Sequence, residues 1–184
     1  METKINFSII VAIDENYGIG KNNKIPWRIE SDMKYFKEIT TKTNDENKMN
    51  ACIMGRKTYE SIPIKFRPLP GRLNIVLSKN QDLIFENTII SHSLDEALNV
   101  ISTKDNIENV FITGGAELYR EAIESPLLTK MYITRIYKNF ECDTFFPNFE
   151  KNLCDQFVLE KEEDEAPLYL TKNINFKFLV YNKK

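Results

Sequence analysis

The chain has 184 residues, of which 42% are hydrophobic and 28% charged, and its formal net charge is -2. This length allows one domain, residues 1–184, with a sizeable core, and the composition is that of a globular protein. Because no basic excess attracts phosphates, general binding to nucleic acid or to a membrane surface is not expected, and any anion site has to be local.

Cysteine usage and the N-terminus favour a cytoplasmic protein. Cys52, Cys142 and Cys154 form no CxxC pair, and the chain has a single histidine. No Cys/His metal site is therefore expected, and reduced thiols are the simpler interpretation. The first 13 residues show no signal-peptide pattern, and no apolar run approaches the roughly 20 residues of a membrane span.

Short apolar runs alternate with helical patterns along the chain. In chain order they predict a strand at 6–13, a helix at 30–41, a strand at 50–55, a short helix at 56–62, strands at 73–78 and 88–91, a helix at 94–101, a strand at 109–113, a helix at 116–123 and strands at 130–137, 156–160 and 174–181. This alternation indicates an α/β fold with a mainly parallel sheet.

Two details refine this pattern. No helix separates the last two strands, so they are expected to form an antiparallel hairpin, and their charged connection, 161–173, is interpreted as a solvated loop. Ser93 and Glu96 fit a capping box that begins the helix at 94–101.

The helix expected at 30–41 carries an acid on its apolar side. Ile29, Met33, Phe36 and Ile39 form its apolar stripe, and at about 100° per residue Asp32 projects into the same stripe. The spacing fits a first-turn acid that the helix dipole favours, and it equally fits a functional carboxylate that faces a pocket.

Two strands lead directly into helices with anion-binding character. Gly114 and Gly115 follow the strand at 109–113, and glycines there let a ligand approach the free N–H groups of the next helix. A tight turn without a ligand would use the same residues. Arg56 and Lys57 begin the helix after 50–55, where cations are unfavourable for the helix dipole unless an anion lies between them. A solvated basic turn is the alternative.

A third strand end has the same character. Ser78 and Lys79 follow the strand at 73–78, which alone is a weak signal. Together the three turns place anion donors at the carboxyl ends of parallel strands, where open α/β sheets bind ligands, and several phosphates suit a dinucleotide. The glycines of YGIGKNNKIP, residues 17–26, lack the third glycine and the helix of a Rossmann fingerprint, so a mobile loop is expected there.

These motifs together resemble dihydrofolate reductases from about Ile5 to Tyr181. The resemblance is carried, in order, by IVAIDENYGIGKNNKIPW, the helix with Asp32, IMGRKTYESIP, RPLPGRLNIVLS, VFITGGAELY, ITRI and ECDTFFP. It implies an eight-stranded, mostly parallel sheet with flanking helices and a C-terminal antiparallel hairpin. It also implies an oxidoreductase that reduces 7,8-dihydrofolate to tetrahydrofolate with hydride from NADPH, for one-carbon metabolism and thymidylate supply.

The resemblance assigns a substrate pocket. Asp32 would be the catalytic acid, bonded to the pterin N–H groups and promoting, through water, protonation of the ring nitrogen beside the carbon that receives hydride. Burial among Met33, Phe36 and Ile62 would raise its pKa. Thr134 would bond to Asp32, and Arg72 would bind the glutamate α-carboxylate. The remaining substrate residues, which on sequence alone also fit ordinary core, would be Ile10, Val11, Trp27, Met33, Phe36, Ile62 and Leu69.

The resemblance also assigns a cofactor site. Its residues would be Ala12, Ile19, Gly20, Arg56, Lys57, Thr58, Leu77, Ser78, Lys79, Gly114, Gly115, Ala116, Glu117, Leu118 and Tyr119. Ala12 and Ile19 would lie near the nicotinamide, 56–58 and 114–119 around the phosphates, and Ser78 and Lys79 around the adenosine ribose. The basic surplus there favours NADPH over NADH. The Gly-Gly peptide would be cis, and the loop at 17–27 would close over the nicotinamide.

The chain departs from the family pattern at two positions near the cofactor. Some members carry arginine where this chain has His92, near the adenine, and a neutral histidine would weaken the grip on the 2′-phosphate. Thr113 stands where a larger aliphatic residue is common, which changes the pocket volume.

Two other functions would require different residues in this chain. A reductase of the same fold that acts on a ribosylated pyrimidine in riboflavin synthesis should lack the combination of Asp32 and Arg72. A non-catalytic nucleotide-binding module should show degraded catalytic residues. Dihydrofolate and antifolate inhibitors are the expected small-molecule partners. The chain is expected to act as a monomer or as a domain fused to thymidylate synthase.

Overall fold

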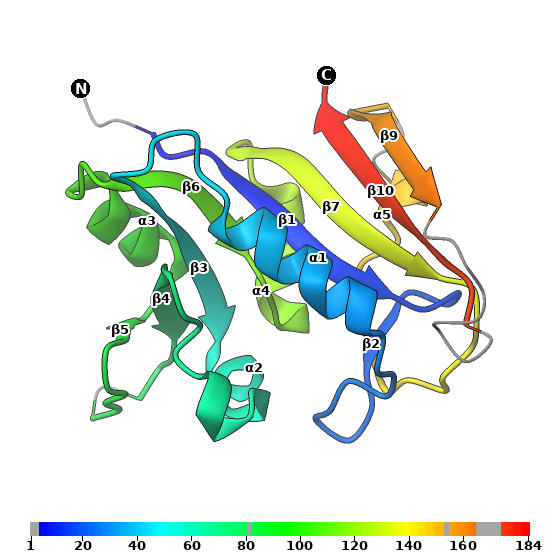
Figure 1. The fold of residues 1–184 in the computed structure, drawn as a ribbon, viewed down its shortest axis with the longest axis horizontal. Coiled ribbons are helices and arrows are strands. Elements are labelled where there is room, and N and C mark those ends of the chain that lie inside the picture. Colours follow the sequence, from blue (N-terminus) through cyan, green and yellow to red (C-terminus); the bar gives the residue numbers. More distant parts are fainter. Residues whose placement is uncertain (1–3, 81, 153–154, 165–173) are drawn as a thin grey trace.

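An eight-stranded sheet forms the centre of the computed structural model, which describes residues 4–80, 82–152, 155–164 and 174–184 (Figure 1). Its strands, in spatial order, are β5 (Ile89–Ser91), β4 (Arg72–Leu77), β3 (Met49–Gly55), β6 (Ile107–Ile112), β1 (Phe7–Ile13), β7 (Leu128–Ile136), β10 (Phe176–Lys183) and β9 (Phe157–Asp164). The neighbours from β5 to β7 pair in parallel, and β10 is antiparallel to β7 and to β9. The predicted mostly parallel sheet with a C-terminal antiparallel hairpin is confirmed.

Helices cover both faces of this sheet. They are α1 (Glu30–Thr41), α2 (Arg56–Ser61), α3 (Leu94–Ser102), α4 (Ala116–Glu124) and α5 (Phe149–Asn152), with a 3-10 helix at Ile64–Phe66. Helix α1 crosses one face, whereas α3 and α4 lie against the opposite face, and α2 begins where β3 ends (Figure 1). The helices predicted at 30–41, 56–62, 94–101 and 116–123 are therefore confirmed.

Alternation along β1 divides the core between the two faces. Ile9 and Val11 pack into the cluster that contains the apolar residues of α3 and α4. Ile10, one residue between them, packs into a second cluster with Cys52, against which Phe36 of α1 is partly buried. Successive side chains of a strand point to opposite faces, so a nearly continuous apolar run serves both layers, as parallel sheets require.

A second, small sheet corrects the loop expected at 17–26. Strand β2 (Gly18–Gly20) pairs in antiparallel register with β8 (Thr144–Phe145). The buried Asp14 carboxylate supports this pairing because it accepts backbone N–H groups from Asn16, Gly18 and Phe140. A Cβ atom at Gly18 would lie 2.4 Å from Cys142 Cβ, so this close approach requires glycine.

Two smaller expectations also change. Ser93 Oγ accepts the Glu96 N–H at 3.1 Å as predicted, but the Glu96 carboxylate accepts the N–H of His92, at 2.6 Å, instead of the N–H of Ser93. Strand β9 extends to Asp164, beyond the predicted end at residue 160. Cys154 and residues 165–173 of the expected loop lie outside the described residues.

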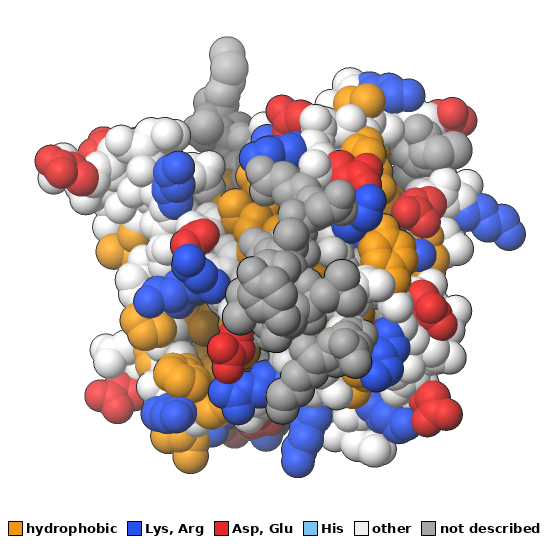
Figure 2. All heavy atoms as spheres, turned by 45° about the vertical axis from the view of Figure 1, so that its right-hand side comes forward, with side chains coloured by type: hydrophobic (Ala, Val, Ile, Leu, Met, Phe, Trp, Pro, Cys, Tyr) orange, Lys and Arg blue, Asp and Glu red, His pale blue; other side chains and the backbone are white. Residues whose placement is uncertain are grey.

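Surface charge is mixed, in keeping with the net charge of -2. On the face in Figure 2, Lys and Arg side chains are interspersed with Asp and Glu side chains. Among the helices that the structure describes, none combines the length and apolarity needed to cross a membrane.

Asn74, in β4, fixes the segment that leads into this strand. Its side chain is 1% exposed. Its Oδ1 accepts the Leu69 N–H at 2.8 Å, and its Nδ2 donates to the carbonyls of Leu69 and Arg72 at 3.0 and 2.9 Å. One buried amide therefore satisfies three backbone groups and sets the positions of Leu69 and Arg72.

Replacing Asn74 by alanine is expected to destabilise the fold by about 2–4 kcal/mol, because three buried backbone groups lose their partner. Denaturant unfolding measures this change. Asn99→Ala, on the exposed surface of α3, is the matched control and should shift stability by no more than about 0.5 kcal/mol. A loss as small as that of the control would contradict the role given to Asn74.

Candidate active site

One large cleft lies at the carboxyl ends of the parallel strands. Its volume is about 1920 Å³, above the roughly 300–1,000 Å³ of a typical pocket for one small ligand. Every residue that the sequence predicted to bind substrate or cofactor lines this cleft. Since neighbouring strands lie about 4.8 Å apart, the edge from β7 to β5 extends over roughly 24 Å, the scale of an extended dinucleotide.

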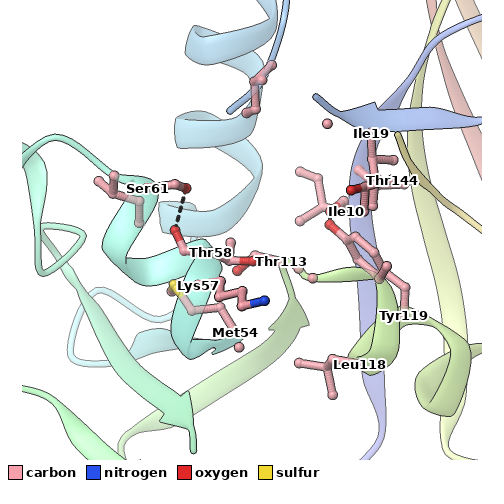
Figure 3. Close-up of a pocket in the computed structure, with 18 of the residues that line it drawn as sticks. Ile10, Ile19, Met54, Lys57, Thr58, Ser61, Thr113, Leu118, Tyr119 and Thr144 are labelled. Carbon is pink, nitrogen blue, oxygen red and sulfur yellow. Dashed lines mark hydrogen bonds between the residues drawn. The ribbon is translucent and has the colours of Figure 1, made fainter. Parts of the chain in front are cut away.

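Two walls face each other across the cleft (Figure 3). One comes from α2, β3 and the end of β6, and the Lys57 amino group points from it into the gap. The other comes from β1, β2 and α4 and carries Ile10, Ile19 and Tyr119. Within the first wall, Ser61 Oγ donates to the Thr58 carbonyl at 2.6 Å (Figure 3).

Asp32 lies in the wall of the cleft next to β7. It projects from the first turn of α1, and its Oδ1 accepts the hydroxyl proton of Thr134 at 2.6 Å. Thr134 pairs in register with Ala12 of β1, which places the acid over the centre of the sheet. Burial raises the pKa of the Asp32 carboxyl, and the hydrogen bond from Thr134 opposes this rise.

The surroundings of Asp32 correct one expectation. Met33, predicted to bury the acid, is 55% exposed, and Phe36 and Ile62 are only half-buried. All three line the cleft. Helix α1 therefore turns this side toward the cleft, and Asp32 faces that space instead of a closed core.

Arg72 lies in the cleft as a buried cation. The residue is 9% exposed. Its Nε donates to the Pro70 carbonyl at 3.0 Å and its Nη1 to Thr40 Oγ1 at 2.8 Å, and the guanidinium lies 5.9 Å from the Phe36 ring centre. Burial lowers its pKa, but arginine is not deprotonated in proteins, so the side chain keeps its charge. No acidic side chain within the described ranges forms an ion pair with it, so part of its donor fork is available for a carboxylate.

The N-termini of α2 and α4 meet at the Gly114–Gly115 turn. Gly114 has φ +137°, and its carbonyl accepts the Gly55 N–H at 2.8 Å. Cβ atoms at Gly114 or Gly115 would lie 3.0–3.1 Å from the side chain of Thr58. The Gly114–Gly115 peptide is cis, as the resemblance implied. Glycines thus let two helix N-termini approach one point, which favours an anion there.

The basic side chains that line the cleft differ in how far an acidic side chain of the protein neutralises their charge. Arg56 Nε donates to Glu60 Oε1 at 2.8 Å, so its charge is partly neutralised within α2. Lys57, Ser78 and Lys79 line the cleft. Beside Ser78, His92 Nδ1 lies 2.8 Å from the Ser78 carbonyl oxygen. Groups that can donate hydrogen bonds to an anion therefore line the cleft from the start of α4 to the end of β5.

Two aromatic residues stiffen the walls. Tyr119, predicted to contact the cofactor, donates its hydroxyl to the Ile10 carbonyl at 2.9 Å, and its ring packs against Phe146. Burial raises the pKa of this hydroxyl far above its usual value. Trp27 lines the cleft and packs against Phe140 at 5.2 Å. The Tyr119 hydroxyl is therefore used within the protein, and a ligand would meet the ring or the backbone.

Sequence reasoning did not assign several residues of the cleft. Lys37 comes from α1, and Thr144 and Phe146 come from the segment around β8. The ECDTFFP motif marked this last segment, but its pairing with β2 has no local signal because the two strands lie more than 120 residues apart.

The described residues offer neither a reactive thiolate nor a cluster of metal ligands. Cys52 and Cys142 are free thiols. Burial raises the pKa of Cys52 to about 12, and burial together with the nearby Asp14 carboxylate raises that of Cys142 to about 11, so both stay protonated near neutral pH. In the described part of the chain, no three His, Cys, Asp or Glu side chains gather as a metal site would require.

Comparison with known proteins agrees with this geometry. The dihydrofolate reductase family model matches residues 6–183. The dihydrofolate reductase of Heliothis virescens is 40% identical over 186 residues, which cover 98% of this chain and 99% of that protein. The enzyme of Drosophila melanogaster is 41% identical over 177 residues, 95% of this chain and 94% of that protein.

A longer relative matches the same region. The bifunctional dihydrofolate reductase-thymidylate synthase of Daucus carota is 43% identical over 181 residues, which cover 95% of this chain and 33% of that protein. Since the family model and two relatives of similar length span nearly the whole sequence, the chain belongs to the dihydrofolate reductase family of oxidoreductases.

Proposed function

We propose that this protein reduces 7,8-dihydrofolate to 5,6,7,8-tetrahydrofolate with NADPH, as a cytoplasmic monomer that supplies one-carbon metabolism. One observation carries the proposal. A single cleft brings together the half-buried acid Asp32 and the buried cation Arg72. The same cleft is lined by groups suited to donate hydrogen bonds to phosphates, from the Gly114–Gly115 turn to Lys79.

The proposal gives the two ends of the folate molecule different partners. The Asp32 carboxylate can accept hydrogen bonds from the pterin ring, which carries several N–H groups. Arg72 can bind the glutamate α-carboxylate in bidentate geometry, because Thr40 and Pro70 hold its guanidinium from behind. The apolar side chains of Phe36, Ile62 and Leu69 between these points suit the flat pterin and aminobenzoyl groups.

The reaction adds a hydride to one carbon of a C=N bond and a proton to the nitrogen. Bound NADPH supplies the hydride. In this proposal Asp32 would promote the protonation through water. Its raised pKa lets it hold a proton at a higher pH than an exposed carboxyl would, which suits acid catalysis. Thr134 orients the carboxyl by its hydrogen bond.

The cofactor site is proposed from the donors along the strand ends. Ala12 and Ile19 would lie against the nicotinamide, and residues 114–119 together with Lys57 and Thr58 around the pyrophosphate. Ser78 and Lys79 would surround the adenosine ribose. The residues present fit this group, because an extended row of backbone and cationic donors faces the cleft and Thr58 touches the glycine turn.

The direct test mixes the protein with NADPH and dihydrofolate and follows the absorbance of the reduced nicotinamide. Its decay, with formation of tetrahydrofolate, would support the proposal. A stable signal with correctly folded protein would refute it, and binding of NADPH without turnover would favour the non-catalytic module.

Asp32→Asn is expected to slow hydride transfer at neutral pH by about 10²–10⁴-fold, because general acid catalysis contributes that much. NADPH should still bind, since Asp32 is not among its donors. Single-turnover kinetics measure the step. The exposed Asp105→Asn, outside the cleft, is the matched control, and an Asp32 variant as fast as this control would exclude the acid role.

Thr134→Val is expected to raise the pKa of Asp32 further, because the lost hydrogen bond favours the charged carboxylate. The decline of the hydride-transfer rate with increasing pH should then move to higher pH. Thr129→Val, on the same strand and outside the cleft, should leave the profile in place. A shift to lower pH in the Thr134 variant would contradict this account.

Arg72→Leu is expected to weaken dihydrofolate binding by about 2–5 kcal/mol, because a buried charge pair loses one partner. A pterin without the glutamate tail should bind nearly as before, and isothermal calorimetry compares the two ligands. Arg28→Leu, at an exposed position outside the cleft, is the control. Equal losses for both ligands would refute the assignment of Arg72 to the carboxylate.

A further inference from the structure

Asp14 is a buried acid to which the proposed reaction gives no role. It directly follows Ile13, the last residue of β1, and it is 1% exposed. Among the ion pairs of the described residues, none involves Asp14. A buried carboxylate without a cation is unfavourable unless hydrogen-bond donors surround it, so the donors around Asp14 indicate what this side chain does.

These donors come from two segments that are far apart in the sequence. Oδ1 accepts the backbone N–H groups of Asn16 and Gly18 at 2.9 and 2.7 Å. Oδ2 accepts the N–H of Phe140 at 3.1 Å, and the Cys142 thiol also hydrogen-bonds to the Asp14 side chain. Gly18 begins β2, whereas Phe140 and Cys142 lie between β7 and β8. One carboxylate at the end of β1 therefore holds the segments that carry both strands of the small sheet.

The small sheet is too short to fix its own position. Strand β2 has three residues, β8 has two, and the two strands form a sheet of their own. An isolated pair of strands is at best marginally stable in water. The position of β2 relative to the central sheet therefore depends on groups that are attached to β1, of which the Asp14 carboxylate is one.

This small sheet contributes to the wall of the cleft. Ile19 of β2 and Thr144 of β8 line the cleft on the same side as Ile10 of β1, opposite Lys57 (Figure 3). In the proposed function, Ile19 lies against the nicotinamide, so the position of β2 affects the position of the hydride donor. Asp14 does not line the cleft, and any effect on the reaction has to pass through β2.

We propose that Asp14 is a positioning residue for hydride transfer, which ties the small sheet to β1 and thereby holds Ile19 against the nicotinamide. The inference rests on the proposed function. Asparagine cannot replace the carboxylate, because an amide has one acceptor oxygen and an NH₂ group that only donates. Whichever way the amide turns, the N–H groups of one of the two segments face a donor.

Asp14→Asn is therefore expected to increase the rate at which NADPH dissociates by about 10- to 100-fold, the effect of losing a hydrogen bond to a charged acceptor. Hydride transfer should also become slower. Stopped-flow displacement by NADP⁺ measures the dissociation rate through the emission of bound NADPH, excited by energy transfer from Trp27, the single tryptophan. The dissociation constant of dihydrofolate, measured by calorimetry, should change less than about twofold, because its proposed partners Asp32 and Arg72 lie on other elements.

Asn50→Ala is the matched control for a general loss of stability. Asn50 is 0% exposed and lies outside the cleft. Its Nδ2 donates to the carbonyls of Thr40 and Lys42 at 3.1 and 2.9 Å, and its Oδ1 accepts the Asn109 N–H at 3.0 Å. Loss of this amide should destabilise the fold in denaturant unfolding but leave the rate of NADPH dissociation unchanged.

Gly18→Ala perturbs the same contact without changing a charge. Its Cβ atom would lie 2.9 Å from Asp14 Cγ and 2.4 Å from Cys142 Cβ, which forces β2 away from the carboxylate. This variant should also release NADPH faster with little change in dihydrofolate binding. It decides the question if Asp14→Asn does not fold.

The outcomes separate the inference from the proposed function. A folded Asp14→Asn, or Gly18→Ala in its place, that releases NADPH as slowly as the natural protein overturns the inference alone. An equal loss of NADPH and dihydrofolate binding, or the same faster release in Asn50→Ala, shows a merely structural role and also overturns it. A natural protein that does not bind NADPH overturns the proposed function together with the inference.

Discussion

The parallel arrangement of the strands from β5 to β7 is the constraint on which the rest of the structure depends. Each parallel strand delivers the segment that follows it to the same edge of the sheet. Gly114 after β6, Arg56 after β3, Ser78 after β4 and His92 after β5 therefore border one cleft, although up to 58 residues separate Arg56 from Gly114. Helices α2 and α4 both begin at this edge, so the positive ends of their dipoles add to the side-chain donors.

The Asp32 carboxyl group in the cleft lowers the stability of the folded state when it is charged. The pKa of Asp32 is higher in the folded protein than in the unfolded chain, so the native state binds more protons than the unfolded state between these two pKa values. Stability therefore falls as the pH rises through that window, and the whole cost is present above it. The hydrogen bond from Thr134 reduces this cost because it favours the carboxylate. A carboxyl group placed in this way thus destabilises the fold once it is charged, a cost that is common at functional sites.

The elements that could be predicted are those that residues close together in the sequence determine. The helices at 30–41 and 94–101 have full apolar periodicity, and Ser93 caps the second as expected. Strand β2 escaped prediction because Gly18–Gly20 has no apolar alternation, and its partner lies more than 120 residues away. The exposure of Met33 was missed for a related reason, since periodicity identifies an apolar face without telling whether that face meets a core or a cleft. The resemblance to a family supplied the site residues, and only the fold could show that they share one cleft.

The two ends of the cleft differ in the physical basis on which they would bind an anion. Arg72 is 9% exposed, so its charge is unfavourable unless a carboxylate pairs with it, and a ligand that lacks this group leaves a buried cation unpaired. Lys79 is exposed, and water solvates its charge when no anion is bound. Discrimination at the Arg72 end should therefore be strict and nearly independent of salt. Discrimination at the Lys79 end should be graded and should respond to salt, because exposed charges are screened.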